Sequence, residues 1–371
     1  ISKSNYELAK EHFIYRNYDS LLDFFNWQTI VKGSHLSVFK NLDKYVKKFF
    51  TDPAVQKVIQ YQQVFLGNSP YNTPALYSIM NHIDFNMGVF YPQGGIYQII
   101  KVLVEIAIKH GVQFSVNSEV EKIEVENHQV TGVKVNGKTL PADIVISNAD
   151  MAHTETQLLD KEYQTFNEAY WEKKTWAPSA LIMYLGVKGQ IPTLTHHNLI
   201  FSKNWQKNFA EIFDDPQWPH DPSLYVSAPS KTDTTVAPAN CENLFVLVPI
   251  AAGLQYTDES LEKYCDKTLQ TMAKVMNISD LQERIEYRKI FCVKDFKQRY
   301  HSYKGTALGL AHTLRQTAIF RPNNYSKKVK GLFFVGAGTN PGIGMPICLI
   351  SAELVYKRIH NIKTAQHLNQ L

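Results

Sequence analysis

A glycine-rich stretch near the end of the chain, residues 331–346, constrains the fold more than any other feature. The apolar run Leu332–Val335 leads into it, as a buried parallel strand would. Four glycines let the backbone turn sharply and approach a ligand closely: Gly336, Gly338, Gly342 and Gly344. Pro346 suits the first turn of a helix, where its missing N–H breaks no bond. The sequence therefore predicts a strand, a tight turn and a helix.

Such a turn presents free backbone N–H groups and the positive end of a helix dipole to whatever lies over it. This arrangement suits an electron-rich group, such as a pyrophosphate or the pyrimidine edge of a flavin. A loop that merely closes an α/β unit without a ligand has the same spacing, so the glycine pattern alone leaves both interpretations open.

The residue order in the turn resembles that of a known family. Gly336-Ala-Gly-Thr-x-Pro-Gly-x-Gly-Met is similar to the C-terminal flavin motif of the bacterial-type phytoene desaturases, the carotenoid branch of the flavin amine-oxidase superfamily. Two positions depart from the family pattern: Asn340 replaces a His, Gln or Thr, and Ile343 replaces a small residue. Every glycine remains, so the turn is expected to form, with Ile343 crowding its flavin side.

The resemblance covers most of the chain. Residues 88–97 are similar to the family's Gly-Gly turn before a helix. Residues 118–123 and 142–150 resemble two strands of its flavin domain, and 303–322 resembles its substrate-side region. His312 stands where the family usually has Pro. The stretches 61–67 and 74–79 look closest to the dehydrosqualene (4,4'-diapophytoene) desaturases.

The resemblance implies FAD as the cofactor and no metal. The resemblance implies that FAD is bound by Val120, Gly336, Ala337, Gly338, Thr339, Gly344, Met345 and Pro346. The catalytic residues are unknown. Asp84, Asp150 and His312 lie in family-like segments and are candidate bases, while a purely structural role is the alternative for each.

The beginning of the chain lacks a pattern that the family implies. Its members open with a strand, a Gly-x-Gly-x-x-Gly turn and a helix, followed by an acidic residue for the ribose. No such pattern occurs before residue 88, and the chain begins with Ile1. We therefore expect a fragment without its N-terminal dinucleotide-binding segment, inactive until that segment is restored.

The expected fold class is α/β (α+β), with an incomplete FAD-binding Rossmann-like domain interleaved with a mixed-sheet substrate domain and a helical segment. Residues 1–87 are assigned to the helical, membrane-associating segment, 88–150 and 330–362 to the FAD-binding domain, and 151–329 to the substrate domain. Strands of the second sheet are expected at 179–188, 197–202, 223–228, 243–250 and 285–293.

Local signals mark several other elements. Asp52 and Pro53 predict the start of a helix that continues through Leu66. Asn136-Gly137 predicts a tight hairpin between two strands. Thr257 predicts the start of a helix that ends near Met276.

Composition is that of a globular protein, with 44% hydrophobic and 20% charged residues among 371. The net charge of +5 is mild, and no dense block of Lys and Arg points to nucleic acid. The four cysteines are too far apart for a paired metal motif and are expected as free thiols of a reducing cytoplasm.

Aromatic residues are abundant, with 20 Tyr and 20 Phe. They are expected either in a large aromatic core or, as the resemblance implies, along an apolar tunnel for a hydrophobic isoprenoid substrate.

No stretch of 18 apolar residues is present, so no segment is expected to span a bilayer. From Val38 to Phe50, apolar residues recur at helical spacing and alternate with Lys40, Lys44, Lys47 and Lys48. Such a basic amphipathic helix either lies in an anionic lipid interface or packs its apolar face inward. The substrate implied by the family is delivered from lipid, so we expect a cytoplasmic protein bound peripherally to the inner face of the membrane.

A polyene offers no carbonyl to polarise, so its dehydrogenation needs a hydride acceptor such as flavin. The expected function is FAD-dependent desaturation of a C30 carotenoid precursor, dehydrosqualene (4,4'-diapophytoene). The alternatives are a carotenoid oxygenase or isomerase of the same fold, and a non-catalytic flavoprotein-like scaffold.

Overall fold

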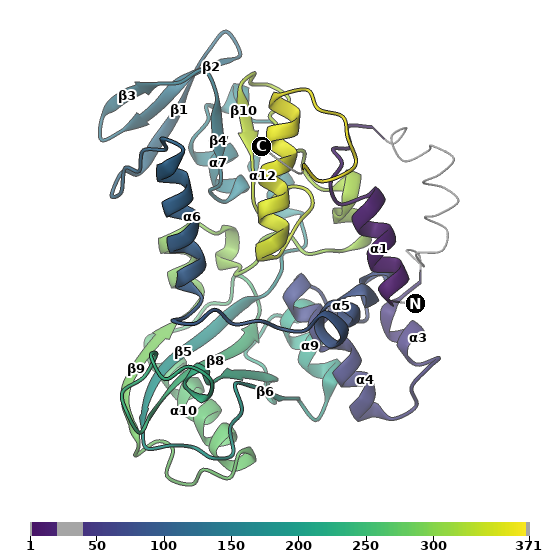
Figure 1. Cartoon of the computed structure of the whole chain (residues 1–371), viewed down its shortest axis with the longest axis vertical. Helices are drawn as coiled ribbons and strands as arrows, with labels where there is room; N and C mark the ends of the chain where they lie inside the picture. The colour runs from purple at the N-terminus through teal and green to yellow at the C-terminus, as the bar shows by residue number, and fades with distance from the viewer. Residues whose placement is uncertain (1, 21–39, 369–371) are drawn as a thin grey trace. The chain divides into compact units, whose positions relative to one another are not determined.

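The structure is a computed structural model that describes residues 2–20 and 40–368 (Figure 1). Its contacts group the chain into two compact units. Unit 1 comprises residues 1–88, 117–177 and 297–371, and unit 2 comprises 89–116 and 178–296. The predicted division into flavin-binding and substrate-binding domains concerns function, and it stays a prediction.

Unit 1 contains two small sheets and a set of mostly short helices. Its helices are α1 (Ser2–His12), α3 (Leu42–Val46), α4 (Pro53–Gln60), α5 (Ile79–His82), α7 (Met151–Gln157), α8 (Glu168–Glu172) and α12 (Met345–Ile359). Its strands are β1 (Val120–Glu126), β2 (Gln129–Val135), β3 (Lys138–Pro141), β4 (Val145–Ser147) and β10 (Leu332–Phe334). Helix α11 (Val293–Tyr300) crosses the boundary between the units.

Strands β1, β2 and β3 form an antiparallel meander. The hairpin predicted at Asn136-Gly137 is confirmed, and both residues have the positive φ angles that such a turn requires. The second sheet pairs β4 with β10 in parallel, with Leu332 opposite Val145 and Phe334 opposite Ser147. It brings together two segments almost 190 residues apart, as Figure 1 shows beside the yellow helix α12.

The helix predicted over residues 38–50 is much shorter than expected. Val38 and Phe39 lie outside the described residues, and α3 covers only Leu42–Val46. Leu42 and Val46 are fully buried, whereas Phe49 is 56% exposed. The helix therefore packs inward, and the residues that follow it leave the aromatic side chains of Phe49 and Phe50 in solvent.

The next predicted helix also ends early. Asp52 caps α4 by accepting hydrogen bonds from the amides of Ala54 and Val55, as expected. The backbone then tightens into a 3₁₀ helix over Tyr61–Leu66. This turn ends at Gly67, which adopts the left-handed conformation.

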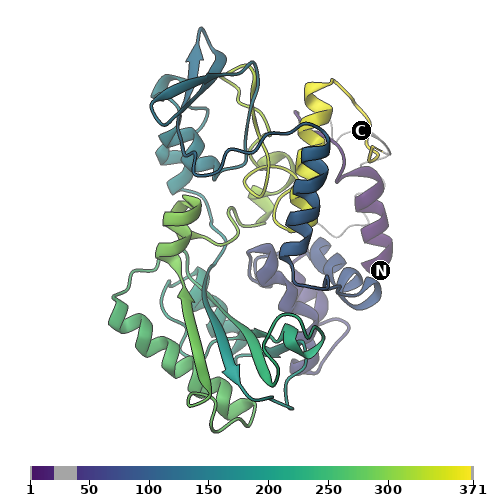
Figure 2. The ribbon, with the colours of Figure 1, turned by 60° about the vertical axis from the view of Figure 1, so that its left-hand side comes forward.

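Unit 2 is built on one five-stranded sheet with the order β6-β7-β8-β5-β9. Its strands are β5 (Ser179–Lys188), β6 (His197–Ile200), β7 (Leu224–Ser227), β8 (Cys241–Ile250) and β9 (Ile285–Phe291), which confirms all five predicted strands. The helices are α6 (Tyr97–Lys109), α9 (Trp205–Phe213) and α10 (Asp258–Val275). Figure 2 shows the green helix α10 running beside these strands.

The prediction of a mixed sheet in this region is wrong, because each neighbouring pair in it is antiparallel. Helix α10 does connect two strands that run in the same direction, β8 and β9. Strand β5 lies between them and pairs with both. The crossover therefore produces no parallel neighbours.

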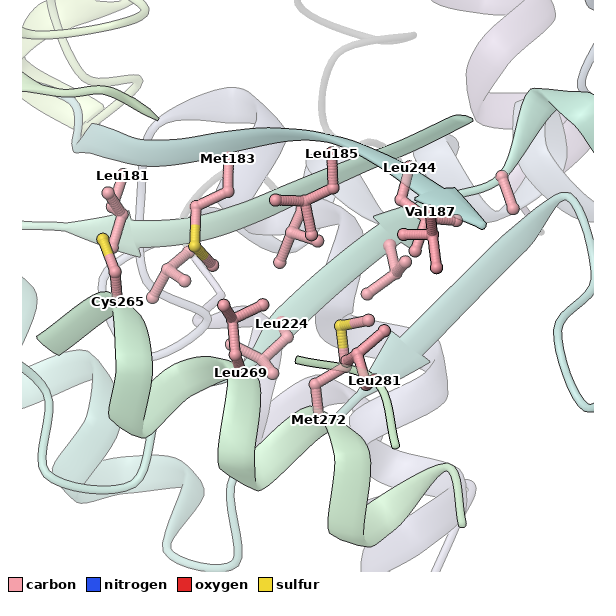
Figure 3. Close-up of a cluster of buried hydrophobic side chains, with 14 of the residues drawn as sticks. Leu181, Met183, Leu185, Val187, Leu224, Leu244, Cys265, Leu269, Met272 and Leu281 are labelled. Atoms are coloured by element: carbon pink, nitrogen blue, oxygen red, sulfur yellow. The ribbon is translucent and has the colours of Figure 1, made fainter. Parts of the chain in front are cut away.

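One face of this sheet packs on α10. Cys265, Leu269 and Met272 of the helix point toward the sheet residues Leu181, Met183 and Leu185 (Figure 3). These side chains are at most 2% exposed. Each fully buried aliphatic side chain contributes roughly 1.5–3 kcal/mol relative to an exposed one, so this layer is the main stabilising element of unit 2.

No helix within residues 2–20 and 40–368 is long and apolar enough to cross a bilayer.

Candidate functional site

The candidate site forms where the two parallel strands of unit 1 end. The amide of Val335, just after β10, donates to the carbonyl of Ser147 at the end of β4. Because the carboxyl ends of parallel strands share one sheet edge, the residues that follow each strand come together there. A Cβ on Gly336 would lie 2.6 Å from Asn148 Oδ1, and the φ of Gly336 is +93°. Only glycine fits this close approach.

Helix α12 supports the turn from behind. Ser351 is fully buried, and its hydroxyl accepts a hydrogen bond of 3.1 Å from the amide of Gly336. The helix begins at Met345 after Gly344, so no side chain caps its first turn. Met345 is 53% exposed. The first-turn amides therefore keep their donor capacity for a ligand.

Seven of the eight predicted FAD-binding residues lie in this single turn, which runs from β10 into α12: Gly336, Ala337, Gly338, Thr339, Gly344, Met345 and Pro346. Val120 lies apart from them in the meander, at the start of β1, where it pairs with Val135. The role of all eight in binding FAD stays a prediction.

Thr339 faces the interior rather than the open side of the turn. Its side chain is fully buried, and its hydroxyl donates to the carbonyl of Pro322 at 2.8 Å. Its own carbonyl accepts from Arg321 Nε at 3.0 Å. Thr339 therefore holds the shape of the turn with its side chain and offers only its backbone amide to a ligand.

Arg321 is a buried residue that holds the turn in place, and sequence reasoning did not single it out. It is 1% exposed and donates to the carbonyls of Leu310, Gln316, Ala337 and Thr339. Burial lowers the pKa of its guanidinium to about 10, so it stays charged at neutral pH. The residue lies in Phe320-Arg-Pro322, at the end of the family-like segment 303–322, and a lone arginine between an aromatic residue and proline was the available signal.

The expectation that Ile343 crowds the flavin side is corrected. Its side chain is 4% exposed, and its Cδ1 lies 3.1 Å from the position that a Cβ on Gly67 would occupy. The side chain therefore points into the protein, where the missing side chain of Gly67 leaves room for it.

Two of the three candidate bases have structural partners. Asp150 caps α7 by accepting from the amide of His153 at 3.1 Å, and it also accepts from the amide of Tyr303 at 3.2 Å. Burial raises the pKa of Asp150. Asp84 accepts hydrogen bonds from the Tyr61 hydroxyl and the Gln62 amide. The third candidate, His312, is considered below.

A model of the flavin containing amine oxidoreductase family matches residues 31–359. The chain belongs to this family. It is 45% identical over 353 residues to a carotenoid 3,4-desaturase of Haloarcula japonica, a match that covers 95% of this chain and 71% of the relative. It is 31% identical over 363 residues to a 4,4'-diapophytoene desaturase of Staphylococcus aureus, covering 94% and 72% of the two chains. These relatives place the chain in the carotenoid desaturase family, and its family membership makes it an FAD-dependent oxidoreductase.

The fold agrees with this assignment. The structure is similar to that of an oxidoreductase from Methanosarcina mazei, with a TM-score of 0.54 and 18% identity over 92% of this chain and 75% of the other. The α/β fold class predicted from the sequence is thereby confirmed.

The residues of the turn fit FAD. The uncapped start of α12 provides amides for an electron-rich group, and the parallel strands and the close approach at Gly336 place that helix start at the sheet edge. Within residues 2–20 and 40–368, no three His, Cys, Asp or Glu side chains are arranged to hold a metal ion.

Proposed function

We propose that this protein desaturates a carotenoid polyene, with FAD held at the turn between β10 and α12. The observation that carries the proposal is the juxtaposition of the glycine turn, the ends of two parallel strands and an uncapped helix in a chain of the carotenoid desaturase family. When bound, FAD supplies the hydride acceptor that a hydrocarbon substrate requires.

The protein's own task is to hold the cofactor and to keep water from the reacting carbon. The first turn of α12 supplies backbone donors, and Arg321 and Ser351 hold the preceding turn in place from the buried side. Because these contacts exist before a ligand binds, they reduce the ordering that binding requires. We assign no residue to proton removal.

Unit 2 carries a surface suited to a hydrocarbon. Strand residues alternate between faces, so the side chains next to those that contact α10 lie on the opposite face of the sheet. Tyr184 and Phe245 pair there with ring centres 5.5 Å apart, and Tyr225 lies 6.3 Å from Phe245. Tyr184 remains 38% exposed. This row of aromatic rings supports the predicted apolar route for an isoprenoid substrate.

The first candidate reaction is 3,4-desaturation of a carotenoid, because the relative that performs it is 45% identical. The second is desaturation of 4,4'-diapophytoene, the C30 substrate expected from the sequence. It is supported by the similar segments at 61–67 and 74–79 and by the relative that is 31% identical.

A product assay with the full-length protein and FAD separates these reactions. Liposomes would carry either a carotenoid saturated at its 3,4 bond or 4,4'-diapophytoene, and products would be identified by absorption and mass. We expect loss of two hydrogens from the first substrate. Desaturation of the second alone would favour the C30 reaction, and conversion of neither by FAD-loaded protein would contradict the proposed function.

The proposal includes peripheral contact with the cytoplasmic face of an anionic membrane. The corner between α3 and α4 exposes the apolar side chains Phe49, Phe50, Val55 and Val58. Lys44, Lys47 and Lys48 lie exposed beside them, although Lys47 also pairs with Asp43 at 2.7 Å. Apolar groups next to cations suit a lipid interface, where each exposed lysine adds about 1 kcal/mol at low salt.

Liposome sedimentation tests this contact. Replacement of Lys40, Lys44, Lys47 and Lys48 by Glu should release the full-length protein from anionic vesicles at low salt and leave binding to neutral vesicles unaltered. Equal sedimentation of the variant and the wild type on anionic vesicles would end the membrane proposal for this corner.

A further inference from the structure

His312 lies directly against the glycine turn of unit 1. The side chain is 4% exposed. A Cβ on Gly342 would lie 2.2 Å from Cε1 and 2.3 Å from Nε2 of its ring. Gly342 has a φ of +131°, a conformation that residues with a side chain rarely adopt. The glycine therefore makes room for the imidazole to reach the backbone of the turn.

The hydrogen bonds of His312 define its tautomer. The amide of Ile343 donates to Nε2 at 3.0 Å. An amide can only donate, so Nε2 carries no hydrogen and, in the neutral ring, Nδ1 does. Nδ1 lies 2.8 Å from the hydroxyl of Tyr77, which must accept that hydrogen. The Tyr77 hydroxyl then donates to Thr317 Oγ1, also at 2.8 Å.

The surroundings of His312 favour this neutral form. Burial and the nearby Arg321 cation lower the pKa of the imidazole well below its usual value. Tyr77 is half-buried, and burial raises the pKa of its hydroxyl, so it stays protonated. A protonated imidazole would direct a second N–H at the amide of Ile343, and two donors would then face each other.

We propose that His312 is a positioning residue for FAD, acting through the amide of Ile343. Bound to that amide, it sets the orientation of the peptide that leads through Gly344 into the first turn of α12. Through Tyr77 it ties this peptide to the 3₁₀ segment Ala75–Ser78, more than 230 residues earlier in the chain. This inference depends on FAD binding at the turn, as proposed above.

In this geometry His312 has no free lone pair with which to act as a base. A base needs a free lone pair within reach of the proton that it removes. Nε2 uses its lone pair on the amide of Ile343, and Nδ1 carries a hydrogen that is directed at Tyr77.

The test compares two replacements of His312 in the full-length flavoprotein. His312→Leu fills similar space but leaves the Ile343 amide without its acceptor and the Tyr77 hydroxyl with Thr317 alone. We expect FAD to dissociate roughly tenfold more readily, since an unpaired buried donor is costly, and the visible flavin spectrum to shift. His312→Gln keeps an acceptor and a donor and should bring the dissociation constant back to within about threefold of the wild type.

Equal FAD dissociation constants and spectra for wild type and His312→Leu would overturn the inference. So would identical behaviour of the Gln and Leu variants, because a purely packing role would not distinguish them. If His312→Leu does not fold, Tyr77→Phe provides a second test, since it removes the hydroxyl that accepts from Nδ1 and donates to Thr317. Wild-type affinity and spectrum in that variant would then overturn the inference.

Gly344→Val separates this inference from the assignment of the site. Gly344 has a φ of +128°, so valine should distort the start of α12 and abolish FAD retention. If Gly344→Val still retains FAD, the site itself is wrongly assigned. If it loses FAD while His312→Leu retains it normally, only the role of His312 is refuted.

A double-mutant cycle tests the contact without FAD. Gly342→Ala should lower the melting temperature less when His312 is already Ala, because the ring that its Cβ would strike is gone. Equal losses in both backgrounds would show that the ring does not lie against Gly342.

Discussion

The five-stranded sheet of unit 2 and the parallel pair β4–β10 of unit 1 are stabilised by different means. In unit 2, strands of up to ten residues cover α10 with aliphatic side chains. In unit 1, strands of three residues are followed by loops. Buried polar side chains hold these loops by hydrogen bonds to the backbone carbonyls and amides of the loops. Apolar burial is tolerant of local detail, whereas each polar contact depends on one donor and one acceptor. The predicted cofactor site therefore lies where stability depends most on individual atoms.

The largest effect is expected from Arg321→Leu. It leaves four buried carbonyls without a donor, and at about 1–3 kcal/mol each the free energy of unfolding should fall by at least about 4 kcal/mol. Urea unfolding followed by circular dichroism measures this loss. Arg321→Lys keeps a cation with fewer donors, so its free energy of unfolding should lie between those of the wild type and Arg321→Leu. A loss below about 1 kcal/mol for the Leu variant would contradict the polar account of unit 1.

Leu269→Ala tests the apolar account of unit 2. Leu269 is 1% exposed in the layer between α10 and the sheet, so its truncation should cost about 2–5 kcal/mol of unfolding free energy. The FAD affinity of the folded protein should not change. Val275→Ala on the same helix, where the side chain is exposed, is the control and should stay within about 0.5 kcal/mol of wild type. A loss of FAD affinity in Leu269→Ala would break the proposed separation of roles.

The buried carboxyl of Glu155 in α7 should make the folding stability of unit 1 depend on pH. It is fully buried, accepts from the amide of Thr165 at 2.7 Å, and burial raises its pKa to about 7 from 4.5. The folded protein thus binds a proton there that the unfolded chain has released. Stability from this group is complete below pH 4.5 and is lost as the pH rises through 7, by up to about 3 kcal/mol.

The Glu155→Gln variant isolates that effect. Its stability should fall less between pH 4.5 and 7 than that of the wild type, because the amide does not titrate. Unfolding free energies at several pH values give the two slopes, and parallel slopes would refute the assignment to Glu155.

The smallest effect is expected at the start of α10. Thr257 and Ser260 form reciprocal hydrogen bonds that cap the helix, so Thr257→Ala should cost about 1 kcal/mol. Thr271→Ala, on the exposed side of the same helix, should change stability by less than about 0.5 kcal/mol. Equal effects of the two replacements would show that the cap contributes nothing specific.

Prediction from sequence succeeded where the signal was local. All five strands of unit 2 lie within a few residues of their predicted bounds, because alternation and turn residues depend on neighbours in the chain. The start of α10 at Thr257 and the strand, turn and helix around Gly336 were found in the same way. Seven predicted site residues share one turn because they were already adjacent in sequence.

Prediction failed where distant segments meet. The pairing of β5 with both β8 and β9, which makes the sheet antiparallel, depends on how α10 returns the chain. The inward direction of Ile343 depends on Gly67, and the partner of His312 Nδ1 is the hydroxyl of Tyr77. Gly67 lies more than 200 residues before Ile343, and Tyr77 lies more than 200 residues before His312. The strands of the sheet are closer to one another in the chain.

The sequence by itself determined the family, the cofactor class and the turn that is proposed to receive FAD, because glycine spacing and strand periodicity are properties of contiguous residues. Only the tertiary structure decided which buried groups hold that turn. Arg321 and His312 acquire their roles from carbonyls and amides that folding brings within hydrogen-bond distance. Hydrogen bonds require atomic proximity and direction, and a linear pattern specifies neither for residues far apart in the chain.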